Sequence, residues 1–106
     1  IISGGENIYP AEIERVLREQ PDVGDVAVIG VPDDRWGEVG KAVVVARPGA
    51  TVDREALLAY CRDHLASFKC PKSVDVVAEL PRNPTGKILK KDLRAPYWEG
   101  RDRQTV

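Results

Sequence analysis

One lysine, Lys87, ends a stiffened loop in the segment "LPRNPTGKILKKDLR" that runs from Leu80 to Arg94. Pro84 fixes one backbone angle of this loop, and Gly86 allows backbone conformations that are closed to other residues. A lysine placed there can be held away from the domain body, and its ammonium can contact a carboxylate and a phosphate at once. The alternative is an ordinary surface lysine near a helix start, where the helix dipole disfavours a cation.

Three well-known site patterns are not supported. A Walker A phosphate loop needs a glycine five residues before Gly86, and this position holds Pro81. His64 is the only histidine of the chain and lies in a predicted helix without a partner in the sequence. It is therefore interpreted as structural or solvated, because neither a Ser-His-Asp set nor a metal cluster can be assembled around it.

Two further segments allow both a functional and a plain structural interpretation. Gly4 and Gly5 of "SGGEN" leave a bare backbone that a thin ligand could pass closely, or they form an ordinary hairpin turn. Trp36 lies in the polar turn "DDRWGE", where exposing an indole ring to water is unfavourable unless the ring packs against another group. Its ring either covers part of the core or offers a stacking platform for a nucleobase or a partner.

A third segment, "SFKCPK", combines the only phenylalanine of the chain, Phe68, with two lysines, of which Lys72 is the second. An aromatic ring beside cations suits a ligand that carries a nucleotide and phosphate groups. The alternative is a buried Phe68 with solvated lysines.

The hydrophobic pattern predicts a small α/β domain of the α+β kind, with a three-stranded sheet flanked by helices. The run "VGDVAVIGV" is rich in β-branched residues between Pro21 and Pro32, which predicts a strand buried on both faces. The expected helices cover residues 10–20, 53–65 and 88–94, and the expected strands cover residues 23–31, 38–46 and 73–77.

Length and composition limit the class of protein. The chain has 106 residues, enough for one domain, and a net charge of −1 that gives no case for a nucleic-acid binder. The charge is uneven, since residues 1–68 hold 12 acidic and 7 basic residues, whereas residues 69–106 hold 5 acidic and 9 basic residues. The second part is therefore the expected face for phosphate or carboxylate groups.

The remaining features concern location and chain ends. Cys61 and Cys70 are interpreted as reduced thiols, which suits a cytoplasmic protein. No membrane span is expected, because no apolar run approaches roughly 20 residues. The chain begins inside "IISGG" without an initiator methionine, so we expect a fragment of a longer protein. We assign residues 1–95 to the domain and residues 96–106 to a loose tail.

Together, "GGENIYPAEIE", "AVIGVPDDRWGE", "KCPK" and "LPRNPTGKILKKDLR" resemble the C-terminal domain of acyl-CoA synthetases of the adenylate-forming superfamily. All four motifs occur in the order and spacing of that family. The resemblance implies a small mobile C-terminal domain that closes over a large N-terminal domain, which is absent from this sequence. In such enzymes a carboxylic acid, often a fatty acid, reacts with ATP to give acyl-AMP, the small domain rotates, and CoA then takes the acyl group.

The resemblance also implies roles for individual residues. Lys87 matches the catalytic lysine of the adenylation step. Gly4 and Gly5 match the loop that lines the pantetheine tunnel after rotation. Trp36, Phe68 and Lys72 match positions that hold the CoA nucleotide in some members. Cys70 stands where some relatives have a basic residue.

By the same resemblance the hinge residue is expected just upstream of Ile1. Mg²⁺ is expected in the full-length enzyme but not bound by this domain. The fragment alone is expected to be inactive.

Two other interpretations remain open at this point. The chain could be a stand-alone phosphate-binding or protein-interaction module that uses the basic segment from Arg82 to Arg94. Within the superfamily it could belong to a peptide synthetase or a luciferase-like oxidase, although "SGGENIYPAEIE" is more similar to stand-alone acyl- or aryl-CoA ligases. The acyl substrate is not predicted, because its pocket belongs to the absent domain.

Overall fold

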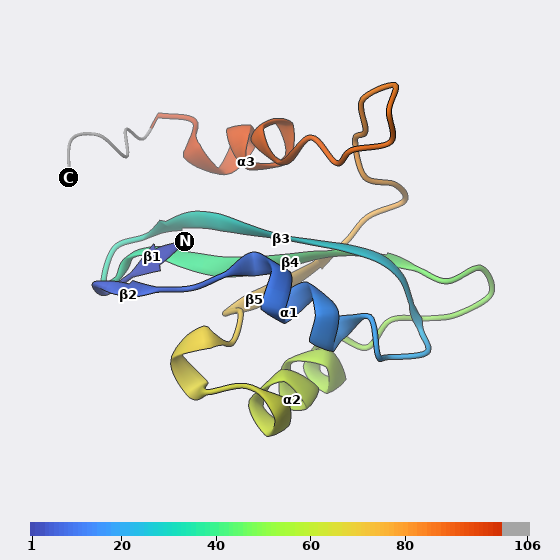
Figure 1. The fold of residues 1–106 in the computed structure, drawn as a ribbon, viewed down its shortest axis with the longest axis horizontal. Coiled ribbons are helices and arrows are strands. Elements are labelled where there is room, and N and C mark those ends of the chain that lie inside the picture. The colour runs from blue at the N-terminus through green and yellow to red at the C-terminus, as the bar shows by residue number, and fades with distance from the viewer. Residues whose placement is uncertain (101–106) are drawn as a thin grey trace.

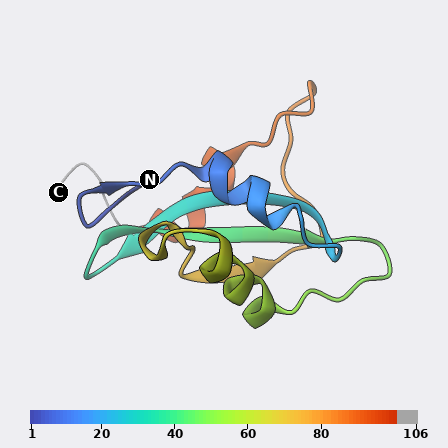
Figure 2. The same ribbon diagram turned by 60° about the horizontal axis from the view of Figure 1, so that its bottom comes forward.

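A three-stranded sheet with helices on both faces forms the body of the domain. The structure, a computed structural model, describes residues 1–100. In the sheet, the order is β3–β4–β5, with β3 and β4 antiparallel and β5 parallel to β4. The elements are β3 (Val23–Asp33), β4 (Gly37–Ala46), β5 (Ser73–Val76), α1 (Pro10–Leu17), α2 (Arg54–His64) and α3 (Lys90–Trp98). Helices α1 and α2 cover one face and α3 covers the other (Figures 1 and 2). The predicted fold class is therefore confirmed.

The residues of β3 divide between two apolar cores. Val26 and Val28 pack in the core beneath α1 and α2, whereas Ala27 and Ile29 pack in the core beneath α3. This division follows from strand geometry, because successive side chains point to opposite faces. The prediction that this strand is buried on both faces is confirmed, since Val26 to Val31 are all buried.

Two predicted helix boundaries are wrong. Helix α1 ends at Leu17, and residues 18–20 form a turn and a bend before Pro21, which disfavours the helical conformation at Gln20. Helix α3 begins at Lys90 and continues to Trp98, four residues beyond the predicted end at Arg94. The first residues assigned to a loose tail therefore belong to this helix, and residues 101–106 of that assignment lie outside the described residues.

Three short elements were not predicted, although a hairpin turn at Gly4 and Gly5 was one of the two interpretations of these residues. Strands β1 (Ile2–Ser3) and β2 (Glu6–Asn7) form a hairpin, and a 3-10 helix, η1 (Ser67–Lys69), precedes β5. Strands of two residues are too short to show an alternating hydrophobic pattern.

Polar contacts attach α3 to the sheet. None of the residues of α3, all of which the structure describes, is fully buried, although Leu93 and Tyr97 pack against the core. The Tyr97 hydroxyl donates a hydrogen bond to Asp75 Oδ2 at 2.5 Å, and Trp98 Nε1 donates one to the carbonyl oxygen of Gly30 at 2.8 Å. The position of α3 thus depends on a few specific bonds.

Both cysteines, Cys61 and Cys70, are free and buried. Burial raises the pKa of the Cys61 thiol to about 11 and also raises the pKa of Cys70. Both groups are therefore neutral thiols at pH 7, which matches their interpretation as structural residues.

We predict that Tyr97→Phe lowers the free energy of unfolding at pH 7 by about 1 kcal/mol, because the variant loses the bond to Asp75. This bond raises the pKa of Tyr97 from its usual 10.0 to about 12. The stabilisation is therefore complete below pH 10 and is lost as the pH rises to 12. Urea unfolding of both proteins should show a difference that narrows over that range.

The control for this prediction is Asp75→Asn, in which an ultraviolet titration should find the pKa of Tyr97 lower than in the wild type, with the part of the rise that burial causes retained. A stability difference between wild type and Tyr97→Phe that stays constant from pH 10 to pH 12 would contradict the assigned bond.

Candidate functional site

The loop that carries Lys87 is closed by backbone pairing and by one asparagine. Arg82 and Ile88 form an isolated antiparallel bridge, and Asn83 N donates to the Lys87 carbonyl oxygen at 2.9 Å. In return, Asn83 Oδ1 accepts a hydrogen bond from Lys87 N at 2.9 Å. Gly86 supplies a backbone φ of 89°, which side-chain-bearing residues rarely adopt. The backbone of Lys87 is therefore fixed at both its donor and its acceptor.

Arg82 ties this loop to the sheet. Its Nη1 donates to the Gly86 carbonyl oxygen at 2.6 Å, while its Nη2 forms an ion pair with Asp25 of β3. The Lys87 side chain is exposed, and within residues 1–100 its ammonium has no ion-pair partner. A fixed backbone thus presents a cation that is free to contact a group outside this domain.

The two glycines of the β1–β2 hairpin form its turn. Ser3 pairs with Glu6, and the intervening Gly4 and Gly5 have φ values of 55° and 87°, as a tight two-residue hairpin requires. A Cβ on Gly4 would lie 2.5 Å from Trp36 Cε3, whereas a Cβ on Gly5 would have no described heavy atom within 4 Å. Gly4 therefore allows the indole to pack on the hairpin, and Gly5 leaves an open backbone surface.

Trp36 is held by the turn between β3 and β4. Asp33 Oδ1 accepts hydrogen bonds from Arg35 N at 2.9 Å and from Trp36 N at 2.8 Å. The Trp36 carbonyl oxygen accepts a hydrogen bond from Gly4 N at 2.9 Å. Although the indole packs on Gly4, it remains 41% exposed, so one part of the ring stays available for stacking.

A buried carboxylate, Glu38, holds the hairpin against the sheet. Its Oε1 accepts a hydrogen bond from Ile2 N at 2.9 Å. The carboxylate reaches this position because Gly30 has no side chain, since a Cβ there would lie 2.0 Å from Glu38 Oε2. The glycine hairpin and Trp36 are thus both positioned by carboxylates of the β3–β4 segment.

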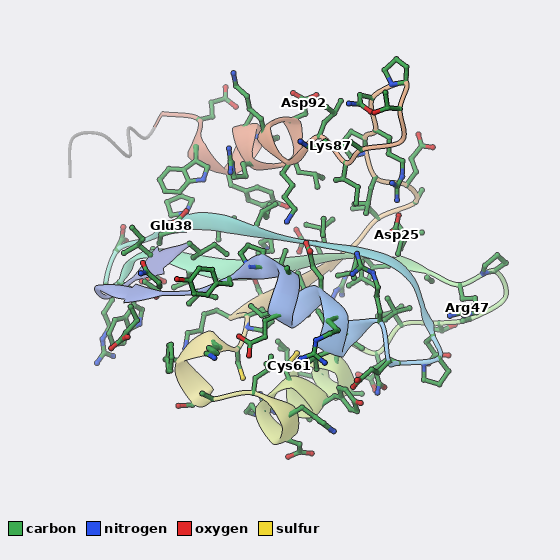
Figure 3. The ribbon with its side chains drawn as sticks, in the orientation of Figure 1. Asp25, Glu38, Arg47, Cys61, Lys87 and Asp92 are labelled. Atoms are coloured by element: carbon green, nitrogen blue, oxygen red, sulfur yellow. The ribbon has the colours of Figure 1, made fainter. Side chains whose placement is uncertain are left out.

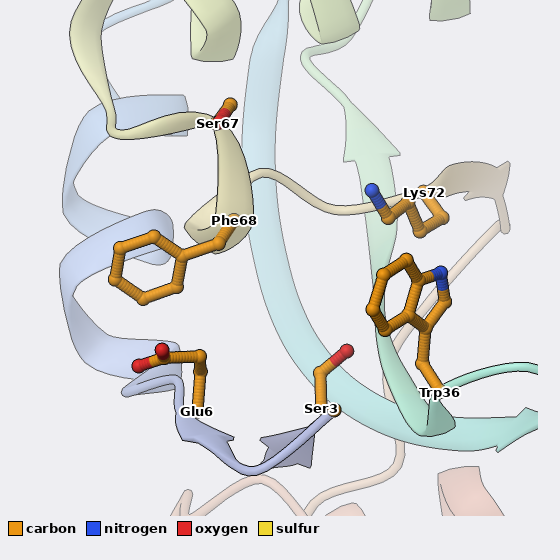
Figure 4. Close-up of a pocket in the computed structure, with 7 residues that line it drawn as sticks. Ser3, Glu6, Trp36, Ser67, Phe68 and Lys72 are labelled. Carbon is orange, nitrogen blue, oxygen red and sulfur yellow. The ribbon is translucent and has the colours of Figure 1, made fainter.

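The hairpin, Trp36 and η1 surround one pocket of about 270 Å³. Figure 4 shows the rings of Phe68 and Trp36 on either side of it, with Ser3 between them. Four of the five residues expected at a cofactor lie here, while Gly5 lies in the adjoining turn. The lining residues are Ser3, Gly4, Glu6, Trp36, Ser67, Phe68 and Lys72.

The pocket is lined by an exposed aromatic ring and by side chains of both charges. Phe68 is 43% exposed, so the interpretation as a buried core residue is wrong. Lys72 supplies a cation and Glu6 an anion to the lining. Cys70 is buried, and its Sγ lies 3.6 Å from the Ala66 carbonyl oxygen, so it does not line the pocket.

Lys87 and the pocket lie toward opposite ends of β3. Trp36 follows the last residue of this strand, Asp33, whereas the lysine loop is anchored at Asp25 near the beginning. The eight residue steps from Asp25 to Asp33 span roughly 26 Å along the strand, at about 3.3 Å per step. In Figure 3, Asp25 lies beneath the lysine loop and Glu38 lies toward the other end of the sheet. The structure therefore divides the residues singled out in the sequence into two groups, Lys87 with its loop and the residues around the pocket.

Several residues of these sites were not predicted. Asp33 and Asn83 each precede a glycine by a few residues in a turn, and this pattern is a usable sign of side chains that cap backbone N–H groups. Glu38 and Glu6 carry no comparable sign, because their roles depend on contacts with distant segments.

Two kinds of feature were not found in the part of the chain that the structure describes. Within residues 1–100, no group of three or more His, Cys, Asp or Glu residues could hold a metal ion. None of the described helices combines the length and the apolar character that a membrane span needs.

Comparison with known proteins places this arrangement in a family. The sequence model of the AMP-binding enzyme C-terminal domain matches residues 12–87. The chain belongs to this family. It is 58% identical over 93 residues to a 3-[(3aS,4S,7aS)-7a-methyl-1,5-dioxo-octahydro-1H-inden-4-yl]propanoyl:CoA ligase of Mycobacterium tuberculosis, covering 88% of this chain and 18% of that protein. It is 58% identical over 97 residues to a feruloyl-CoA synthase of Amycolatopsis, covering 92% of this chain and 20% of that protein.

Solved structures agree with this assignment. A fatty acyl CoA synthetase of Mycobacterium tuberculosis superposes with a TM-score of 0.87 at 51% identity, covering 96% of this chain and 20% of that one. ATP-bound MatB of Rhodopseudomonas palustris superposes with a TM-score of 0.89 at 44% identity over the same shares. The chain thus spans about a fifth of the length of the enzymes that it matches.

We predict that Gly4→Ala displaces the Trp36 ring, because the new methyl group would lie 2.5 Å from Cε3. The indole N–H resonance of Trp36 in a ¹H–¹⁵N NMR spectrum should shift, whereas that of Trp98, the other tryptophan, should stay in place. Gly5→Ala is the matched control, since it adds the same strain of roughly 1–2 kcal/mol from a positive φ without this clash. Equal shifts of the Trp36 resonance in both variants would contradict the assigned contact.

Proposed function

We propose that this domain is the C-terminal lobe of an AMP-forming acyl-CoA ligase. The full-length enzyme activates a carboxylic acid with ATP to give acyl-AMP and pyrophosphate. The thiol of CoA then attacks the acyl carbon, and the products are acyl-CoA and AMP. Family membership and the CoA-ligase relatives support this proposal. ATP, CoA and the acid are substrates bound together with a preceding N-terminal domain, which would also hold Mg²⁺.

The single observation that carries the proposal is the presentation of Lys87. Adenylation brings a carboxylate to the α-phosphate, and negative charge accumulates on oxygen atoms between the two groups. A cation fixed near these oxygens lowers the barrier, provided that it is already oriented before reaction. The Asn83 contacts hold the Lys87 backbone, and the exposed side chain leaves the ammonium available to a substrate in another domain.

The pocket at the other end of β3 suits the second half-reaction. The open backbone of Gly5 accommodates the thin pantetheine arm next to the hairpin. Trp36 and Phe68 supply stacking surfaces for the adenine end of CoA, and Lys72 supplies a cation for a phosphate. Because the lysine loop and this pocket lie far apart, one active centre can meet each of them only after the domain rotates.

We also propose a cytoplasmic location. ATP and CoA are the substrates of the proposed reaction, and the free thiols of Cys61 and Cys70 fit a reducing compartment.

In the full-length enzyme, Lys87→Ala should slow adenylation by roughly two to three orders of magnitude, because a preorganised charge of the transition state is lost. Single-turnover release of pyrophosphate measures this step. Thioester formation from supplied acyl-adenylate and CoA should change by no more than a few-fold. Lys91→Ala is the matched control, since Lys91 is an exposed lysine of the same segment. Equal loss in both half-reactions would contradict the role of Lys87.

Lys72→Ala, in contrast to Lys87→Ala, should impair the second half-reaction and leave the first unchanged. We expect the KM for CoA in the second half-reaction to rise by about three- to tenfold, as for the loss of one partly exposed ion pair with a phosphate. Pyrophosphate release in the first half-reaction should stay at the wild-type rate. A variant with an unchanged KM for CoA would remove Lys72 from the proposed nucleotide contacts.

A further inference from the structure

Glu14 joins three elements through one carboxylate. It lies on α1 and is only 8% exposed, which is unusual for a glutamate on a surface helix. Its Oε2 accepts a hydrogen bond from Val28 N of β3 at 2.8 Å. The same oxygen lies 2.8 Å from Lys90 Nζ at the start of α3. A single side chain thus reaches from α1, across the edge of the sheet, to the helix on the opposite face.

The partner of Glu14 lies next to the lysine loop. Lys90 is the first residue of α3 and follows Lys87 by three positions. A cation at a helix N-terminus is disfavoured by the helix dipole, so Lys90 is better placed when a carboxylate neutralises it. Because α3 has no fully buried residue within the described chain, its first turn depends on such contacts.

The lysine loop is therefore fastened at both ends to one strand. On its N-terminal side, Arg82 pairs with Asp25 of β3. On its C-terminal side, Lys90 pairs with Glu14, which is itself bonded to Val28 of β3. Between these two ion pairs the loop is closed on itself by the Asn83 contacts described above.

We infer that Glu14, through its ion pair with Lys90, is a positioning residue for Lys87. It does not touch the reacting groups. It fixes the position of the loop's C-terminal end relative to β3. The ammonium of Lys87 is thereby held in one orientation toward the substrate oxygens. This inference rests on the proposed function of Lys87. It assigns to α1 a part in the first half-reaction, although this helix lies on the opposite face of the sheet from α3 (Figures 1 and 2).

The test uses Glu14→Gln in the full-length enzyme. Glutamine keeps an oxygen that can accept from Val28 N but cannot form an ion pair with Lys90. We expect single-turnover pyrophosphate release to slow by about five- to thirtyfold, since misplacement of a catalytic group by a fraction of an ångström is costly. Thioester formation from supplied acyl-adenylate should be unchanged. If Glu14 had a purely structural role, the rates of both half-reactions would fall together.

Four further variants sharpen this test. Lys90→Gln should reproduce the effect of Glu14→Gln, and the double variant should be no slower than either single variant, because both remove the same ion pair. Lys90→Arg should restore most of the adenylation rate. Glu12→Gln is the matched control, since Glu12 of the same helix forms an ion pair with Lys69 at 3.1 Å and has no contact with the lysine loop within the described residues. It should leave adenylation unchanged.

The possible failures are distinguishable. If Lys87→Ala slows both half-reactions equally, the proposed function fails. If Lys87→Ala slows adenylation alone but Glu14→Gln slows neither or both half-reactions, only the inference about Glu14 fails. Additive effects of Glu14→Gln and Lys90→Gln, or a Lys90→Arg variant as slow as Lys90→Gln, would also overturn it.

Discussion

The outer edge of β3 is the constraint on which much of this domain depends. The strand is paired with β4 on one side only, so the N–H and C=O groups on its other side need partners outside the sheet. Side chains supply them: Asp25 accepts from Val26 N, Glu14 accepts from Val28 N, and Trp98 donates to the Gly30 carbonyl oxygen. Glu14 and Trp98 belong to helices on opposite faces, so satisfying the edge also fixes both helices on the sheet.

A few polar side-chain contacts also hold the two ends of the β3–β4 hairpin. At one end, Asp33 caps the turn that carries Trp36, and Glu38 binds the backbone of the glycine hairpin. At the other end, Arg82 binds both its own loop and Asp25. Each end is held by short polar contacts to the hairpin and not by a deep apolar core of its own. A rigid hairpin with two ordered ends is what a domain needs if it presents either end to one partner.

The fold could be predicted from sequence where periodicity and burial agree. The β-branched run of β3 and the apolar face of α1 identified their elements, because alternation and helical spacing are local properties. The two-residue strands β1 and β2, and the continuation of α3 to Trp98, could not be predicted in this way, since both depend on contacts with distant residues such as Glu38 and Gly30. The site residues followed motifs, and the structure gathered Gly4, Trp36, Phe68 and Lys72 around one pocket. Of the carboxylates that support them, Asp33 is marked by its turn sequence, whereas Glu38 is not, because a buried glutamate in a strand is not marked by its neighbours in sequence.

The distance between the lysine loop and the pocket bears directly on how such a lobe could work. A rigid strand of this length cannot bring both ends to one reacting atom, so no single orientation of the lobe serves both half-reactions. In the function proposed above, rotation would separate the steps in time, since Lys87 would move away from the active centre as the pocket approaches it. The contacts that hold each end must therefore survive the movement unchanged, and this requirement favours bonds within the lobe over bonds to its partner domain.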